Sequence, residues 1–366
     1  MSAPEPFRVA FLLAALTAAR AIGPWFGDPA THADELIFGF LVLQLFGFLL
    51  VALPRWIGRP LGPAPAIWLV LAAQGAAFLL GFHDLELAGR LRSLIGLAGV
   101  ALLLANTPAG KTAATFPVLL LAGLHAGLGV GRYTFDWAGS TMAGLALILL
   151  ICLEVSNRVG AALVAVARER AGRPPRPALP GWLRLAERAS AALALVLFGL
   201  DGPAGLPALI AGLLGGHWLW HQRVWQIKPY AGVVIMVVGM VWKRVGLLLL
   251  AAWSFGVGDV PQLAVIHVLT IGGLATLAIG IATSIVRKRE KRSLTPSGLA
   301  NLTYAAIIAA MAARVGGALV PDWHDGLVMT GRWLWLTAFT GYFAFVIAHA
   351  FRPLAKPVEL PHLHEP

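Results

Sequence analysis

Residues 36–53 read LIFGFLVLQLFGFLLVAL, a run of 18 residues in which Gln44 is the only polar side chain. An apolar run of this length is long enough to cross the hydrocarbon core of a bilayer as a helix. The rest of the chain is similar, because 58% of its 366 residues are hydrophobic and only 12% are charged. A soluble chain carries about twice that fraction of charge. The sequence therefore predicts an all-α polytopic membrane protein.

Proline, glycine and charged residues divide the remaining sequence into further apolar runs of similar length. We expect about twelve transmembrane helices in a single membrane domain, residues 1–366. The first six fall in residues 1–166, a basic loop follows at 167–181, the last six fall in 182–352, and a tail occupies 353–366. The predicted spans are 7–26, 34–53, 63–82, 89–106, 113–134, 137–156, 182–200, 203–222, 231–254, 261–286, 296–318 and 328–351.

Charge alternates from one loop to the next. Loops rich in Lys and Arg, such as 168–176 and 287–292, alternate with loops that carry Asp and Glu, such as 84–86. Basic loops stay on the cytoplasmic side of a membrane. An even number of spans then puts both termini in the cytoplasm. The net charge of +11 reflects this topology and not a nucleic-acid partner, and the single cysteine, Cys152, excludes a disulfide framework.

Three ionisable side chains, His32, Asp34 and Glu35, lie at the start of the second apolar run. Such groups are costly inside a membrane and often mark functional sites. Imidazole and carboxylate groups are the usual protein ligands of iron, copper and zinc. His32 and Glu35 are three residues apart and share a helix face. The alternative is a polar helix start, because acidic residues favour the positive end of the helix dipole.

His267 lies about six residues inside the tenth apolar run. An imidazole at this depth needs a partner. It could ligate a metal or haem iron through one ring nitrogen while the other nitrogen is hydrogen-bonded, or it could bond to a neighbouring helix. His83 and His125 are further imidazoles expected on the outer side of the membrane.

Lys243 and Arg244 fall near the middle of the ninth run. They could bind an anion, pair with a carboxylate or hold the propionates of a haem. Arg20 and Arg314, near the outer face, could hold propionates as well. Buried cations also mark permeation pathways, so a transporter or channel for a small anion or metal is an alternative function.

Two motifs resemble the NnrS family. Residues 32–40, His-Ala-Asp-Glu-Leu-Ile-Phe-Gly-Phe, are similar to the family's His-Ala-His-Glu-Met-Leu-Phe-Gly-Phe. Residues 47–59 continue the match, close to the family's Gly-Phe-Leu-Leu-Thr-Ala-Val-Pro-Asn-Trp-Thr-Gly-Arg. Residues 267–273, His-Val-Leu-Thr-Ile-Gly-Gly, are similar to its His-Leu-Leu-Thr-Val-Gly-Ala. The resemblance covers essentially the whole chain.

The resemblance implies a multi-pass protein of the bacterial inner membrane that binds haem and copper. It also implies a role in the response to nitric oxide during denitrification or nitrosative stress. His32, Glu35 and His267 match family positions and are the first candidates for cofactor binding. The wider candidate set comprises Arg20, Arg244 and Arg314 for haem, and Asp34, His125 and His83 for a metal.

The chain departs from the family pattern at several histidine positions. Asp34 replaces the second histidine of the first motif, and residues 236–239 of the ninth span contain no histidine. Either one metal has been lost, or residues such as His83, His125 or Asp34 substitute. A scaffold without any cofactor is therefore a third possible function, and the sequence does not establish catalysis.

Overall fold

The computed structural model describes residues 5–23, 29–137, 139–174, 176–226, 231–290 and 298–352. Within these residues the chain is all-helical and forms twelve helices, as the apolar runs predict. Ten are simple helices: α1 (Pro6–Arg20), α4 (Ala64–Leu80), α5 (Leu85–Ala105), α6 (Thr112–Phe135), α7 (Ser140–Arg170), α8 (Gly181–Gly199), α9 (Gly205–Gln222), α10 (Ala231–Ser254), α13 (Gly298–Leu319) and α14 (His324–Ala350).

The other two helices each contain a wider π-helical segment. In the first, α2 (Pro29–Asp34) leads into the π-helix η1 (Glu35–Phe40) and then into α3 (Leu41–Ile57). In the second, α11 (Gln262–His267) leads into η4 (Val268–Ala275) and α12 (Thr276–Arg289). Short 3-10 turns lie at Ala109–Lys111, Val224–Gln226 and Pro321–Trp323.

The chain is a polytopic membrane protein. Eight helices in the described part are long and apolar enough to cross a membrane, judged by length and composition. Large apolar side chains also point outward from the bundle: Leu69 is 70% exposed and Leu213 is 58% exposed. A lipid environment accommodates such side chains without the cost of exposing them to water.

Helix α7 is longer than the predicted span, which ends at residue 156. It continues to Arg170 because no proline interrupts it before Pro174. Val164 and Ala167 on this extension pack against Val233 of α10. The helix therefore extends into the predicted basic loop, residues 167–181.

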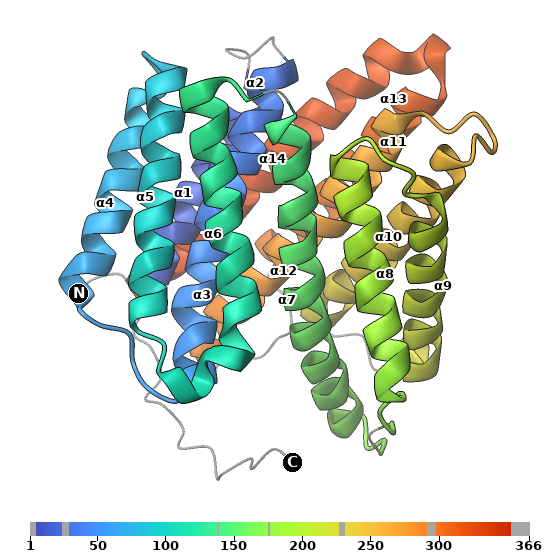
Figure 1. Cartoon of the computed structure of the whole chain (residues 1–366), viewed down its shortest axis with the longest axis horizontal. Helices are drawn as coiled ribbons and strands as arrows, with labels where there is room; N and C mark the ends of the chain where they lie inside the picture. Colours follow the sequence, from blue (N-terminus) through green and yellow to red (C-terminus); the bar gives the residue numbers. More distant parts are fainter. Residues whose placement is uncertain are drawn as a thin grey trace.

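The two composite helices form the centre of the bundle. About 78% of the most apolar window of Ala30–Ile57 and 83% of that of Gln262–Arg289 is buried, against 39–56% for the other six candidate spans. Helices α4, α5 and α6 pack in sequence on one side of this centre, and α7, α8, α9 and α10 on the other (Figure 1). Helix α1 packs against α3 and α14 and so brings the start and the end of the chain together.

The first and last helices meet at one end of the bundle. The guanidinium of Arg8 donates to the carbonyl oxygens of Ala350 (3.0 Å) and Arg352 (2.6 Å), and it pairs with Glu290 at the end of α12 (3.0 Å). Because α1 begins there and α12 ends there, the starts of both composite helices lie at the opposite end. His32 and His267 are near those starts.

Candidate functional site

A cavity of about 570 Å³ lies between the two composite helices. Residues of α1, α7, α13 and α14 complete its walls. Cavities that bind cofactors and other small molecules commonly measure about 300–1,000 Å³. The cavity extends from the starts of the composite helices down to Leu41 and Leu274, and most of its wall is aliphatic or aromatic.

The polar side chains of the cavity are all neutral or basic. Three imidazoles, His32, His267 and His324, and two guanidiniums, Arg314 and Arg332, line it. Among the described residues no Asp or Glu lines the wall, and no ion pair neutralises either arginine there. The cavity therefore combines metal-ligating nitrogens with a positive charge that favours a ligand bearing carboxylates or other anionic groups.

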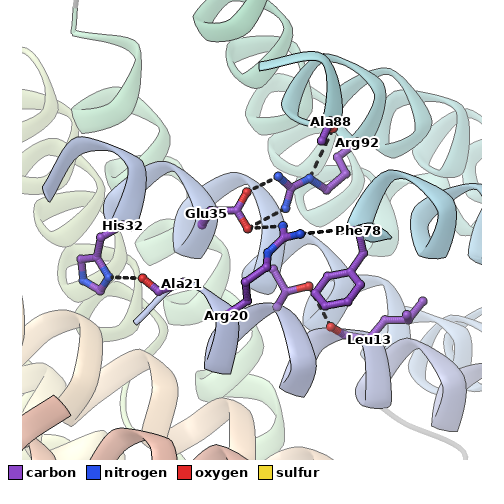
Figure 2. A network of polar contacts seen from close by, with 9 residues as sticks. Leu13, Arg20, Ala21, His32, Glu35, Phe78, Ala88 and Arg92 are labelled. Carbon is purple, nitrogen blue, oxygen red and sulfur yellow. Dashed lines mark hydrogen bonds and ion pairs between the residues drawn. The ribbon is translucent and has the colours of Figure 1, made fainter. Parts of the chain in front are cut away.

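The ring of His32 is oriented by a backbone carbonyl. Its Nδ1 lies 3.1 Å from the carbonyl oxygen of Ala21, at the end of α1 (Figure 2). A carbonyl only accepts, so Nδ1 carries the hydrogen and Nε2 keeps its lone pair. This is the arrangement that fixes the tautomer and orientation of metal-ligating histidines.

The ring of His267 is less completely satisfied. Its Nε2 lies 3.3 Å from Nη2 of Arg314. The guanidinium can only donate, so Nε2 accepts this long contact. The buried Nδ1 has no hydrogen-bond partner of normal geometry within the described part of the chain. Only Nε2, through its long contact with Arg314, is therefore placed to exchange its partner for a bound group.

His32 and His267 each lie immediately before, or within one turn of, a π-helical segment. His32 precedes Glu35–Phe40 and His267 directly precedes Val268–Ala275. The π-helical turns inside α-helices often occur at functional sites. Glycines permit the close packing here: a Cβ at Gly39 would lie 2.7 Å from Arg92, and one at Gly272 would lie 3.0 Å from Trp242.

Glu35 lies beside the cavity but does not line it. Its carboxylate pairs with Arg20 at 2.5 Å and receives two contacts from Arg92, one of them at 3.0 Å (Figure 2). Arg20 also donates to the carbonyl of Phe78 and lies over the Phe78 ring. One carboxylate thus joins η1, α1 and α5, and both of its oxygens are engaged by guanidiniums.

Asp34 has partners on two other helices. Its carboxylate accepts from Arg132 of α6 at 3.0 Å and from Thr141 of α7 at 2.7 Å. Thr141 itself lines the cavity. Asp34 therefore connects the start of the first composite helix to both neighbours, outside the cavity wall.

The other predicted imidazoles lie elsewhere. His125 is buried against the ring of Phe38 and lines a separate cavity of about 30 Å³ with Gln74. His83 is exposed in the turn after α4. Throughout the described ranges, no three or more His, Cys, Asp or Glu side chains gather where they could hold a metal ion.

Lys243 and Arg244 of α10 are engaged by residues of α7 and α8. Arg244 pairs with Glu187 at 2.9 Å and donates to Asn157 at 3.1 Å. The ammonium of Lys243 donates to the Ser156 hydroxyl. Neither residue lines the cavity that contains His32 and His267.

Two residues of the site were missed by sequence reasoning. Arg332 and His324 both belong to α14 and line the cavity. Nδ1 of His324 lies 2.8 Å from the carbonyl oxygen of Gly317, so this ring too keeps a free nitrogen. A signal was available for Arg332, because it is a second basic residue within an apolar run near the outer end.

Comparison with known proteins agrees with the two sequence motifs. The sequence model of a family described as NnrS protein matches residues 3–353, nearly the whole chain. No protein of curated function matches it.

Proposed function

Because the chain belongs to the NnrS family, we propose that it is a haem-binding membrane protein of the response to nitric oxide, in which His32 would hold the haem iron. The family is associated with haem and copper, and membership implies involvement in that response. The observation that carries the proposal is the geometry of His32. Its Nδ1 is held by the Ala21 carbonyl, and it lines a cavity of cofactor size.

His267 is proposed as the second imidazole of the site. Its Nε2 is already shared with Arg314 over a long contact, so it would hold the iron only weakly. A bound haem would supply an iron centre that can take a diatomic gas. The chain's own residues supply orientation at His32, a displaceable imidazole at His267 and an apolar wall that excludes water.

Arg314 and Arg332 are proposed to hold the propionates of the haem. Both line the same cavity as the two histidines, and no carboxylate of the described chain neutralises them. Bidentate contact between a guanidinium and a carboxylate is among the strongest hydrogen-bonding arrangements in proteins. Arg20 and Arg244 are already paired with Glu35 and Glu187, so we do not include them in this role.

Replacing Arg314 or Arg332 by alanine is expected to weaken haem binding. A hydrogen bond to a charged group contributes about 1.5–3 kcal/mol, which corresponds to an affinity loss of roughly 10- to 100-fold for each arginine. The measurement is a haem titration followed by absorbance, on protein purified without haem. Arg→Lys variants keep the charge and should lose less affinity.

Arg188→Ala is the matched control for these variants, because Arg188 is a half-exposed arginine on α8 that contacts Glu154 away from the cavity. It should bind haem as wild type does. If Arg314→Ala and Arg332→Ala also bind haem with unchanged affinity, the propionate assignment is wrong.

Copper is left out of the proposal. No cluster of three candidate ligands exists in the part of the chain that the structure describes. Asp34, which stands at a family histidine position, is engaged by Arg132 and Thr141. The residues present therefore fit haem and do not fit a three-ligand copper site.

The cavity is proposed to face the periplasm. It lies at the end of the bundle opposite the contacts between Arg8, Ala350 and Glu290. The positive-inside rule supports a cytoplasmic location for the end that carries the basic loops. This orientation in the bacterial inner membrane would be tested by labelling introduced cysteines from the periplasm, at Asp84 for the outer end and at Arg59 for the inner end.

The physiological role is tested by nitric oxide challenge of a bacterium that lacks its own copy of the gene. Wild-type protein should restore growth under nitric oxide, and His32→Ala should not. Exposed His83→Ala is the control and should restore growth fully. Equal growth with wild type and His32→Ala, at equal protein levels, would contradict a role for haem at His32.

A further inference from the structure

A second hollow lies directly below the large cavity. It measures about 70 Å³ and runs between α3, α7 and α12. Leu41 and Leu274 line both hollows, so these two buried side chains form the partition between them. The two hollows therefore lie end to end along the interface between the two composite helices, and Leu41 and Leu274 separate them.

The lower hollow is not closed on all sides. Three of its lining residues, Leu45, Cys152 and Ala278, are half-buried. Cys152 follows Ser140, the first residue of α7, by twelve residues, which is about 18 Å along the helix. The hydrocarbon core of a bilayer is about 30 Å thick. If α7 enters the membrane at Ser140, the open side of the hollow faces lipid tails and not water.

The walls of the lower hollow offer few hydrogen-bonding groups to water. Apart from Gln44 and Cys152, the lining residues are aliphatic or aromatic. The Gln44 amide is already engaged, since it donates to the Ala278 carbonyl at 2.9 Å and accepts from Tyr342 at 3.2 Å. Apolar cavities of this kind stay dry and take up apolar ligands such as xenon.

We propose that this hollow admits nitric oxide from the lipid to the large cavity, and that Leu41 and Leu274 form the gate. Nitric oxide is a small, uncharged diatomic gas that dissolves readily in hydrocarbon, so an opening among lipid tails suits it better than it suits ions. The two leucines must change rotamer to connect the hollows, and their flexible side chains permit this without movement of the helices. The inference rests on the proposed function, because the large cavity must hold the gas-binding haem.

The first test uses xenon and the haem-free protein in lipid nanodiscs. Wild-type protein is expected to shift and broaden the ¹²⁹Xe resonance in a saturable manner. Leu274→Trp should lower the saturable part, because the indole fills the lower hollow while the large cavity still takes up xenon. Leu302→Trp, an exposed site on α13 outside both hollows, should behave as wild type. Saturable xenon binding that is equal in wild type and Leu274→Trp would overturn the route.

The second test uses the haem-loaded protein and carbon monoxide, which can be released by a light pulse. Leu274→Trp should slow bimolecular rebinding about tenfold or more, equivalent to a barrier increase of about 1.4 kcal/mol. Leu274→Ala should accelerate rebinding, and Leu302→Trp should leave it unchanged. If Leu274→Trp misfolds, Leu274→Phe is the milder variant and should slow rebinding less.

The two tests separate failure of the route from failure of the proposed function. Haem-loaded Leu274 variants that rebind carbon monoxide at the wild-type rate overturn the route and leave the haem site intact. A wild-type protein that takes up no haem overturns the proposed function, and with it the destination of the route. Slowed rebinding in the Trp variant together with faster rebinding in the Ala variant supports both.

Discussion

His32→Ala is expected to remove haem from the purified protein. The imidazole of His32 lines the large cavity, and its ring is fixed by the Ala21 carbonyl. Under the proposed function His32 would be the main bond between the chain and the iron, whereas His267 offers only a nitrogen shared with Arg314. The haem content, measured as the pyridine haemochrome per mole of protein, should fall from equimolar to near zero.

Rescue of His32→Ala by imidazole distinguishes loss of a ligand from misfolding. Alanine leaves a space for a free imidazole, so added imidazole should restore the Soret band of His32→Ala. A misfolded protein would not recover in this way. His83→Ala, at an exposed site, should retain full haem content. Full haem content with an unchanged spectrum in His32→Ala would exclude His32 as the ligand.

Of the variants named, Glu35→Ala is expected to lower the free energy of unfolding the most. The carboxylate is buried between Arg20 and Arg92, with all three side chains 2–3% exposed. Removing one partner of a buried ionic cluster leaves uncompensated charge and costs about 3–5 kcal/mol. In a membrane protein this should appear as a large fall in the unfolding midpoint, measured in detergent by denaturant or heat.

Glu86→Ala is the matched control for Glu35→Ala. Glu86 also pairs with an arginine, Arg90, but its side chain is 66% exposed. An exposed ion pair of this kind contributes about 0.3–0.5 kcal/mol, so Glu86→Ala should unfold almost as wild type does. Equal stability of the Glu35 and Glu86 variants would contradict the buried cluster.

Glu35→Gln separates the structural role from a ligand role. The amide keeps the shape of the side chain and one acceptor oxygen, so part of the fold stability should be retained. Because Glu35 lies outside the cavity wall and both its oxygens are engaged, the haem spectrum of this variant should be unchanged. A shifted spectrum would favour Glu35 as a cofactor ligand, as the family motif implies.

Most of the fold was predictable because membrane helices are set by local composition. The runs around residues 63–82, 203–222 and 231–254 match α4, α9 and α10 closely. The end of α7 was missed because a helix that leaves the membrane becomes more polar without a change of conformation. The π-helical segments were not predictable, because they depend on how the two composite helices pack.

The site was predictable only in part, because sequence gives the depth of a residue but not its neighbours. His32, His267 and Arg314 were expected at similar depth, and the structure brings all three to one cavity. Glu35 and Arg20 lie at that depth too, yet they pair with each other and with Arg92. Which helix faces which decides between these outcomes, and no local pattern encodes it.

The decisive measurement is the absorption spectrum of the wild-type protein, purified from cells supplied with haem. We expect a Soret band, a haem content equimolar with the protein, and a change in the reduced spectrum when nitric oxide is added. Absence of a Soret band from folded protein, even after incubation with haem, would contradict the assignment of the cavity lined by His32 and His267.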